Sequence, residues 1–148
     1  MKLGIKEIEQ IIPHRHPFLL VDYIEDMVQG EYAIGYKCVT FREDFFKGHF
    51  PEYPVVPGVI LCETMAQAGG AALSFQKKVP DGSLFFFATL DKVKFRNQVR
   101  PGDTVRMEIT NLRVSSRMIK QVGKAYVGDT LCAEAEWMCL VSGAGANS

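Results

Sequence analysis

The chain has 148 residues, a length typical of a single domain with one hydrophobic core, so one domain is expected over residues 1–148. Its 17 basic and 17 acidic residues give a net charge of zero, which argues against a protein that binds nucleic acid. The start of the chain carries acids where a secretion signal needs an apolar run, so a cytoplasmic protein is expected.

The first part of the chain predicts a short helix, a connector and a hairpin. Isoleucines recur at helical spacing over residues 4–12, and the prolines of residues 13–17 then end the helix and form a rigid connector. Two strands are expected at residues 18–27 and 31–40, joined by a turn at residues 29–30.

A long loop and an apolar helix follow. Residues 41–57 contain several prolines and are expected to form a loop, and loops of this length in compact domains usually carry function. The helix is expected to begin at Pro57 or Gly58 and to run to about Lys78. Because it is apolar on nearly all sides, it must be buried. Its charged and polar residues favour burial within the protein over membrane insertion.

The remainder of the chain predicts strands separated by turn residues. They are expected at residues 84–90, 92–96, 104–114, 118–127 and 130–141. Residues 142–148 are rich in small residues and are expected to form a loose tail. One buried helix among these strands predicts an α+β fold, in which a curved antiparallel β-sheet wraps a long central helix.

The cysteines occur in apolar patterns without the paired Cys-x-x-Cys spacing of metal or redox sites. They are Cys38, Cys62, Cys132 and Cys139. Such residues are usually reduced thiols packed in the core, which agrees with a cytosolic location.

Glu63 lies early in the apolar helix, where a carboxylate is expensive to bury. Burial favours the protonated form of a carboxyl group, so Glu63 is a candidate general acid. Gln67 follows one turn later and is expected to hydrogen-bond Glu63 or a shared water. The alternative is that both residues lie on a solvent-exposed face of the helix.

Two further residues could complete this chemistry. His49 in the preceding loop is a candidate base, although a lone loop histidine is more often an ordinary surface residue. Gly58 has no side chain to keep its N–H away from a ligand oxygen, and the positive end of the helix dipole lies there. A neutral acid paired with a histidine base predicts elimination or hydration chemistry.

Metal and thiol chemistry fit less well. His14 and His16 in the connector could offer nitrogen ligands together with His49, but no His-Glu-x-x-His pattern is present, so no metal site is expected. Cys62 has no histidine near it in sequence and is expected to be an unreactive buried thiol.

Several stretches of the sequence resemble one family of enzymes. Residues 13–22 read Pro-His-Arg-His-Pro-Phe-Leu-Leu-Val-Asp, and residues 45–67 contain Gly-His-Phe-Pro followed by Pro-Gly-Val-Ile-Leu-Cys-Glu. With residues 87–96 and 99–103, they make nearly the whole chain similar to the FabZ-type 3-hydroxyacyl-[acyl-carrier-protein] dehydratases. The resemblance implies a hot-dog fold and a homodimer with two composite active sites, commonly assembled as a trimer of dimers.

The resemblance also implies a substrate and a mechanism. The substrate is a (3R)-3-hydroxyacyl chain on the phosphopantetheine arm of acyl carrier protein, and the product is the trans-2-enoyl chain of fatty acid biosynthesis. No cofactor is implied. His49 of one subunit takes a proton from C2, and Glu63 of the other gives its proton to the departing C3 hydroxyl. Gly58 N–H steadies the thioester oxygen, and Gln67 positions Glu63.

By the same resemblance, residues that line the acyl tunnel are Phe50, Val59, Phe87 and Thr89. A basic run near the expected tunnel mouth is the candidate landing site for the acidic carrier protein, although such a run is more often a solvated strand face. Its residues are Lys92, Lys94, Arg96 and Arg100.

The sequence departs from the family pattern at three positions. His16 stands where the family usually has tyrosine, Tyr23 where arginine is common, and Thr89 where glycine is typical. The last change lies near the expected acyl channel and leaves the tunnel length open. Glu63, in place of aspartate, favours a plain dehydratase. A dehydratase that also isomerises its trans-2 product to the cis-3 form remains an alternative, as do a hot-dog thioesterase and a non-catalytic acyl-binding protein.

Overall fold

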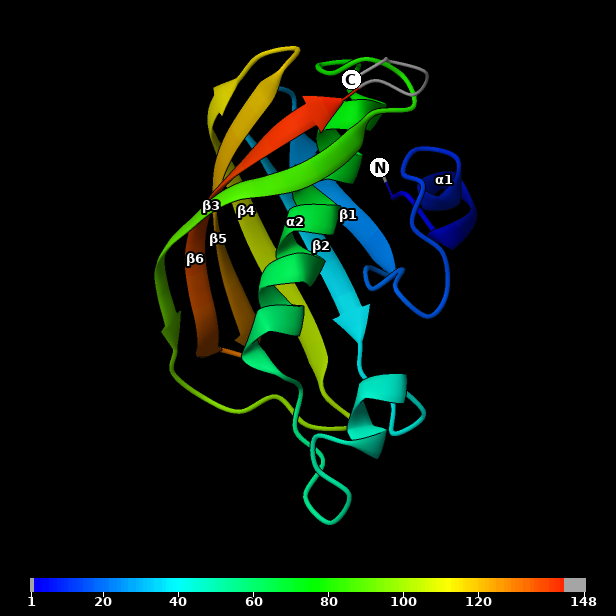
Figure 1. Cartoon of the computed structure of the whole chain (residues 1–148), viewed down its shortest axis with the longest axis vertical. Coiled ribbons are helices and arrows are strands. Elements are labelled where there is room, and N and C mark those ends of the chain that lie inside the picture. Colours follow the sequence, from blue (N-terminus) through cyan, green and yellow to red (C-terminus); the bar gives the residue numbers. More distant parts are fainter. Residues whose placement is uncertain (1, 143–148) are drawn as a thin grey trace.

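The computed structural model describes residues 2–142, which form one curved sheet around a long helix (Figure 1). The expected loose tail at residues 142–148 lies outside the described residues except for Ser142, which ends the last strand. The helix α2, Gly58–Phe75, lies in the hollow of the sheet, and the short helix α1, Ile5–Glu9, lies outside it beside β1.

The sheet has six antiparallel strands in the order β1-β2-β4-β5-β6-β3. Their bounds are Tyr23–Val28 (β1), Tyr32–Cys38 (β2), Leu84–Phe95 (β3), Thr104–Val114 (β4), Met118–Val127 (β5) and Thr130–Ser142 (β6). The expected α+β hot-dog fold is therefore confirmed. Because β3 pairs only with β6 among the described strands, its other edge is open.

Some predicted bounds were wrong. Residues 18–22 are irregular, and the first strand begins only at Tyr23. Helix α2 ends at Phe75, short of the expected Lys78, because Lys77 adopts a left-handed conformation with φ of 60°. The N–H of Lys78 then bonds to the carbonyl of Leu73 and closes the helix end. The predicted helix at residues 4–12 is shorter as well, at Ile5–Glu9.

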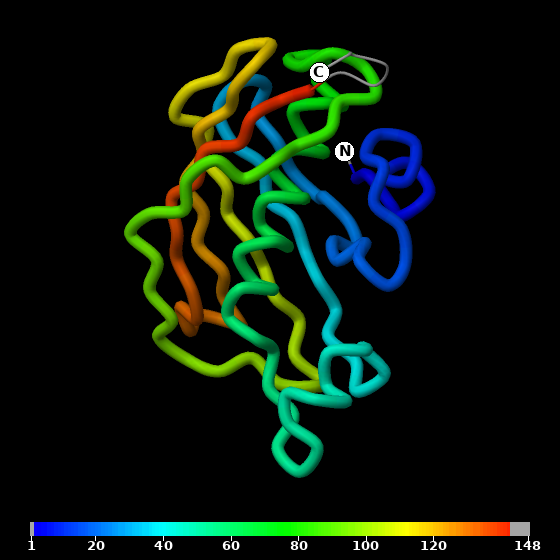
Figure 2. The backbone as a smooth tube through the Cα atoms, viewed as in Figure 1, coloured from blue at the N-terminus to red at the C-terminus, as the bar shows by residue number. Residues whose placement is uncertain are grey.

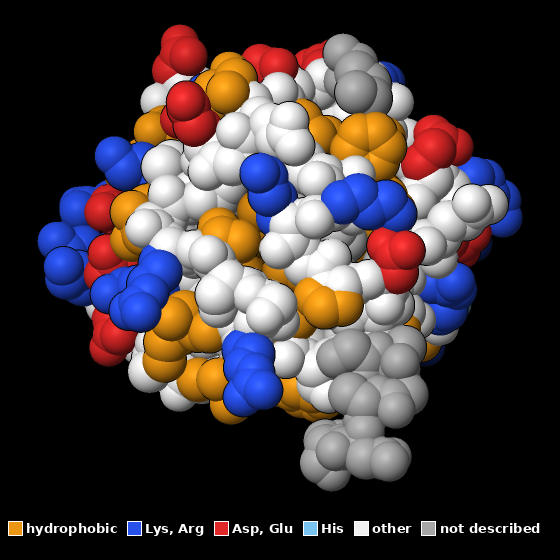
Figure 3. All heavy atoms as spheres, turned by 90° about the horizontal axis from the view of Figure 1, so that it is seen from above, with side chains coloured by type: hydrophobic (Ala, Val, Ile, Leu, Met, Phe, Trp, Pro, Cys, Tyr) orange, Lys and Arg blue, Asp and Glu red, His pale blue; other side chains and the backbone are white. Residues whose placement is uncertain are grey.

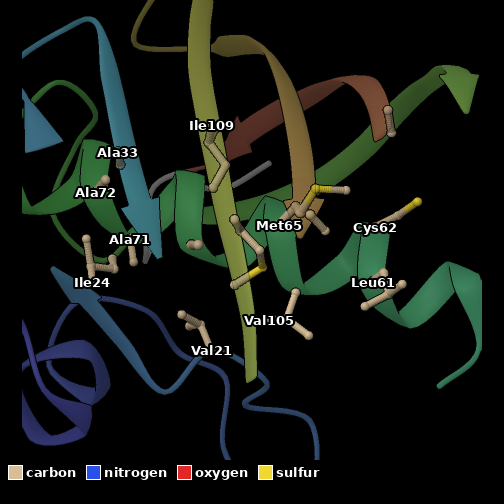
Figure 4. Packing of buried hydrophobic residues seen from close by; sticks show 14 of the residues in the cluster. Val21, Ile24, Ala33, Leu61, Cys62, Met65, Ala71, Ala72, Val105 and Ile109 are labelled. Carbon is tan, nitrogen blue, oxygen red and sulfur yellow. The ribbon is translucent and has the colours of Figure 1, made fainter. Parts of the chain in front are cut away.

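The core lies between α2 and the concave face of the sheet. Side chains alternate between buried and exposed along β4 and β5, as expected for a sheet with one covered face. Met65 of α2 and Val105 and Ile109 of β4 are buried members of this core (Figure 4). Three of the cysteines belong to this interior, but Cys38 is exposed, so its assignment to the core was wrong. It ends β2, where alternation turns its side chain outward.

The loop before α2 is anchored at several points. It contains a short 3-10 helix, Asp44–Lys47, whose Phe46 is buried. Lys37 of β2 forms a buried ion pair with Glu43, with nitrogen and oxygen 2.9 Å apart. Near the helix start, the loop runs beside the segment that follows β3 (Figure 2), and Val56 N–H donates to the Val99 carbonyl at 2.8 Å. These contacts fix the segment that carries His49.

Candidate active site

Glu63 lies in the second turn of α2 and is half-buried. Its Oε2 accepts a hydrogen bond from Gln67 Nε2 at 2.9 Å, so the expected contact one helical turn apart is formed. Burial raises the pKa of Glu63 above its ordinary value, and the bond from Gln67 opposes part of that rise. A protonated carboxyl group is therefore favoured at this position.

Gln67 is held in one orientation by the chain around it. Its Oε1 accepts from the backbone N–H of Leu20 at 2.8 Å, and its Nε2 also donates to the Phe18 carbonyl at 2.8 Å. With only 3% of its surface exposed, Gln67 does not belong to a solvent face of the helix. Because the amide oxygen is occupied by Leu20, the amide nitrogen must face Glu63.

A small cavity adjoins Glu63. Its volume of about 20 Å³ has room for one water molecule. The lining is mostly apolar and comprises Ile12, His14, Glu63, Ala66, Gln67, Phe85, Phe87 and Cys139. Burial raises the pKa of Cys139 to about 12, so this thiol stays neutral. The chemistry available in the cavity therefore comes from His14, Glu63 and Gln67.

His14 is the residue at this site that sequence reasoning missed, because its flanking prolines favoured a purely structural connector. Its Nε2 lies 3.8 Å from Glu63 Oε2. Burial, with a smaller contribution from the Arg15 charge, lowers the pKa of His14, so the ring is neutral. Its position in the Pro-His-Arg motif of residues 13–15 was the one available signal for a role near the acid.

His49 lies in the loop before α2, with its ring stacked on that of Phe50 at 4.1 Å. Its Nδ1 is 2.9 Å from the carbonyl oxygen of Val55. A carbonyl only accepts, so Nδ1 carries the proton and Nε2 keeps a free lone pair. His49 does not line the cavity beside Glu63 in the same chain.

Gly58 is the first residue of α2. Its N–H has no acceptor among residues 2–142, as is usual for the first turn of a helix. A Cβ atom at this position would approach the ring of Phe95 to 2.6 Å. A side chain at position 58 would therefore have to displace the ring of Phe95, which is 55% exposed at the end of β3.

The four predicted tunnel residues are exposed in the single chain, and only Phe87 reaches the cavity beside Glu63. Val59 is 66% exposed and Phe50 49% exposed. Thr89 follows an irregularity in the pairing of β3 with β6, between Phe87 and Thr89. Three of these four exposed side chains, those of Phe50, Val59 and Phe87, are apolar.

The basic run on and after β3 is largely balanced by acids of β6. Lys92 pairs with Glu136 at 3.5 Å, and Arg96 with Glu134 at 2.7 Å. Lys94 lies opposite Glu134 in the strand register. Arg100 lies over the ring of Tyr53, with its Cζ 4.1 Å from the ring centroid. In the view from above, positive and negative side chains also occur side by side (Figure 3).

Two further observations concern metals and membranes. Within residues 2–142, no group of three or more His, Cys, Asp or Glu side chains is placed to hold a metal ion. None of the described helices is both long and apolar enough to cross a membrane.

Comparisons with known proteins show which family the chain resembles. The family described as the FabA-like domain matches residues 12–136. The 3-hydroxyacyl-[acyl-carrier-protein] dehydratase FabZ of Desulforamulus reducens is 49% identical, over 94% of this chain and 97% of that protein. FabZ of Caulobacter vibrioides is 48% identical, over 94% and 88% respectively. The dehydratase heterocomplex ApeI:P from Xenorhabdus doucetiae shares the fold, with a TM-score of 0.78 at 15% identity over 94% of this chain and 93% of that one.

Proposed function

As a member of the FabZ family within the FabA-like domains, this chain is a 3-hydroxyacyl-[acyl-carrier-protein] dehydratase of fatty acid biosynthesis, and we propose that its site is shared between two copies. The observation that carries the mechanism is the half-buried Glu63, held by Gln67 in a mostly apolar cavity. Burial raises the pKa of Glu63, which favours the protonated form that a general acid needs.

In this mechanism, His49 Nε2 takes a proton from C2 of the (3R)-3-hydroxyacyl thioester. The electron pair of that C–H bond forms the C2–C3 double bond, and the C3–O bond breaks. Glu63 protonates the departing hydroxyl, which leaves as water. Since Gln67 occupies Oε2 of Glu63, the proton is given from Oε1. The free N–H of Gly58 donates to the thioester oxygen as negative charge develops there.

We infer that two copies share the site because the base and the acid do not line the same cavity in one chain. His49 is not part of the cavity that Glu63 lines in the same chain. The open edge of β3 exposes Phe86, Phe87 and Leu90, and such an edge is a ready surface for pairing with another strand. In our proposal a second copy covers this edge, completes the acyl tunnel past Phe50, Val59, Phe87 and Thr89, and brings its own His49 to Glu63.

The proposed partner is an acyl carrier protein that presents the substrate on its phosphopantetheine arm. Carrier proteins of this kind are acidic, so the landing site must offer positive charge. Lys92 and Arg96 are paired with acids of β6, which leaves Lys94 and Arg100 as the stronger candidates within the basic run. Glu63, rather than aspartate, favours a trans-2-enoyl product without isomerisation.

Mixing two inactive variants tests the shared site. His49→Ala and Glu63→Gln each remove one catalytic group, so each pure variant is expected to be inactive. After subunit exchange, a mixed dimer carries one site with both defects and one intact site. We therefore expect activity to return to about a quarter of the wild-type level at equal mixing, because half of the dimers are mixed and each has one working site.

Verified exchange without recovered activity would contradict the shared site. Subunit exchange is followed independently by mass spectrometry of differently tagged variants. Products from a carrier-bound 3-hydroxydecanoyl substrate are analysed in the same samples. A 3-enoyl product would show that the enzyme also isomerises, and release of free thiol without enoyl product would indicate a thioesterase.

A further inference from the structure

His14 is a neutral imidazole next to the catalytic acid, and the proposed mechanism does not use it. Its ring lines the same cavity as Glu63, and its Nε2 faces Glu63 Oε2 at 3.8 Å. Its other ring nitrogen, Nδ1, is buried and has no hydrogen-bond partner among residues 2–142. An unpaired buried atom is not sufficient by itself, since Ser74 Oγ shares this property. His14 differs because its second nitrogen faces a carboxyl group.

The position of the ring proton follows from these contacts. A neutral imidazole carries one proton, on either Nδ1 or Nε2. A proton on Nδ1 would be a buried donor without an acceptor, which is less favourable than an unpaired lone pair on that atom. The proton therefore resides on Nε2, the nitrogen that faces Glu63. His14 thus presents an N–H donor to the same carboxyl oxygen that accepts from Gln67.

We propose that His14 is a positioning residue that stabilises Glu63 as a carboxylate, by supplying a second N–H donor to Oε2 beside the amide of Gln67. The inference deepens the proposed dehydratase mechanism and rests on it. When Oε1 gives its proton to the leaving hydroxyl, the negative charge develops in a mostly apolar cavity. Two donors aimed at the charged group lower the free energy of that carboxylate and of the transition state that leads to it. His14 itself neither gains nor loses a proton.

The gap of 3.8 Å closes by a small movement or by one water. It is too long for a direct hydrogen bond. No hydrogen bond within residues 2–142 holds the ring through Nδ1, so none has to break when the ring turns toward the carboxylate. The cavity volume of about 20 Å³ also admits a single water between the two groups. Because the charge is created during the reaction, the donor is needed most in the transition state.

Few other charges act on this pair. The guanidinium of Arg15 donates to the backbone carbonyls of Glu9, Ile12 and His14. β6 contributes Cys139, which is neutral, and β3 contributes only Phe85 and Phe87. Within residues 2–142, Gln67 and His14 are therefore the side chains of this cavity that can offer an N–H donor to Glu63.

The test compares two substitutions of His14 with one substitution of His16. His14→Leu removes the donor, whereas His14→Gln places an amide N–H near the position of Nε2 and cannot titrate between pH 5 and 10. His16→Gln is the matched control, since His16 is exposed in the same connector. We expect His14→Leu to lower kcat by about tenfold or more with a smaller change in KM, His14→Gln to recover most of that loss, and His16→Gln to match wild type.

The pH profile separates a donor from a structural role. Dehydration requires protonated Glu63, so the alkaline limb of kcat follows loss of its proton. Removing a donor to the carboxylate disfavours that loss, and we expect the limb of His14→Leu to move to higher pH. A lower rate with an unmoved limb would overturn the proposal. Equal defects in His14→Leu and His14→Gln would also overturn it, because they would indicate that the imidazole acts by gaining or losing a proton, which an amide cannot do.

A titration without substrate keeps this test independent of the reaction. The carboxyl carbon of Glu63 is followed by ¹³C NMR and assigned by its loss in Glu63→Gln. A higher titration midpoint of Glu63 in His14→Leu than in wild type and His14→Gln supports the donor role. This result does not depend on activity. An active Glu63→Gln protein would refute the proposed mechanism, but it would leave the donor role standing. An unchanged midpoint in a folded His14→Leu protein refutes the donor role.

Discussion

Helix α2 lies between two buried polar clusters that differ in how completely their atoms are paired. In the first, Trp137 Nε1 donates to Gln121 Oε1 at 3.0 Å, and Gln121 Nε2 donates to Asn111 Oδ1 at 2.8 Å. This paired cluster packs against Gly69 of the helix. In the second, the acid cluster, Gln67 is fully bonded, but among residues 2–142 Glu63 has one donor and the His14 ring has no partner within hydrogen-bond distance.

The two clusters face nearly opposite sides of the helix, because Gly69 and Gln67 are two positions apart at 3.6 residues per turn. Complete pairing makes the first cluster a structural element, since any change leaves a buried group unsatisfied. Incomplete pairing in the second leaves bonding capacity for a substrate, beside a cavity that holds one water. The acid cluster is therefore distinguished by unpaired polar atoms next to a carboxyl group and a cavity, and not by burial alone.

Glu63→Gln in the acid cluster is expected to have the largest effect, a loss of activity without a loss of stability. The amide keeps an oxygen to accept from Gln67, so the fold is expected to be retained. It has no acidic proton, and we expect dehydration to fall by about a thousandfold. Activity is measured on a carrier-bound substrate and folding by thermal melting, with exposed Glu52→Gln as the matched control. A Glu63→Gln enzyme with near wild-type turnover would remove Glu63 from the chemistry.

Gln121→Leu in the paired cluster is expected to lower stability and to leave activity nearly unchanged. Leucine has a similar volume but leaves Trp137 Nε1–H and Asn111 without their partners. We expect a loss of about 2–3 kcal/mol in the free energy of unfolding, with kcat per folded molecule nearly unchanged. Urea unfolding at a fixed chain concentration measures this, and exposed Gln29→Leu serves as the control. A stable but inactive Gln121→Leu protein would show that the two clusters are coupled.

Gln67→Leu is expected to affect stability and activity together, since Gln67 serves both the fold and the acid. It leaves the Leu20 N–H and the Phe18 carbonyl unpaired, at a cost of about 1–3 kcal/mol in stability. It also removes the bond that opposes the rise in the pKa of Glu63. We expect kcat to fall by about tenfold and its alkaline limb to move to higher pH. An unmoved limb would mean that Gln67 only supports the backbone of residues 18–20.

The features of these regions differ in how well they could be predicted from the sequence. The buried helix, the alternating strands and the contact between Glu63 and Gln67 could be predicted because each depends on spacing along one element. The start of β1 was missed because residues 18–22 form an irregular segment. Its backbone bonds to Gln67 through Phe18 and Leu20, and Leu20 is 47 positions from Gln67 in the sequence. No local pattern distinguishes that segment from a strand.

His14 was missed for a related reason. Its neighbours in sequence are prolines and an arginine, which describe a connector, whereas its role depends on an acid 49 positions later in the chain. The placement of His49 relative to Glu63 is harder still, because in our proposal it depends on a second copy. Sequence spacing predicts neighbours within an element, and it says little about groups brought together from a loop, a helix and another chain.

The smallest expected effect concerns the pH dependence of stability, compared between wild type and Glu63→Gln. Below the ordinary pKa of 4.5, Glu63 is neutral in both folded and unfolded chains and has no effect. As pH rises above that value, the unfolded chain ionises first, because burial keeps the folded pKa raised. Wild type is therefore expected to lose stability relative to Glu63→Gln until pH exceeds the raised pKa, where the difference levels off. Urea unfolding of both proteins from pH 4 to 9 measures it, and a difference that stays constant or reverses would show that Glu63 is ionised at little cost in the folded protein.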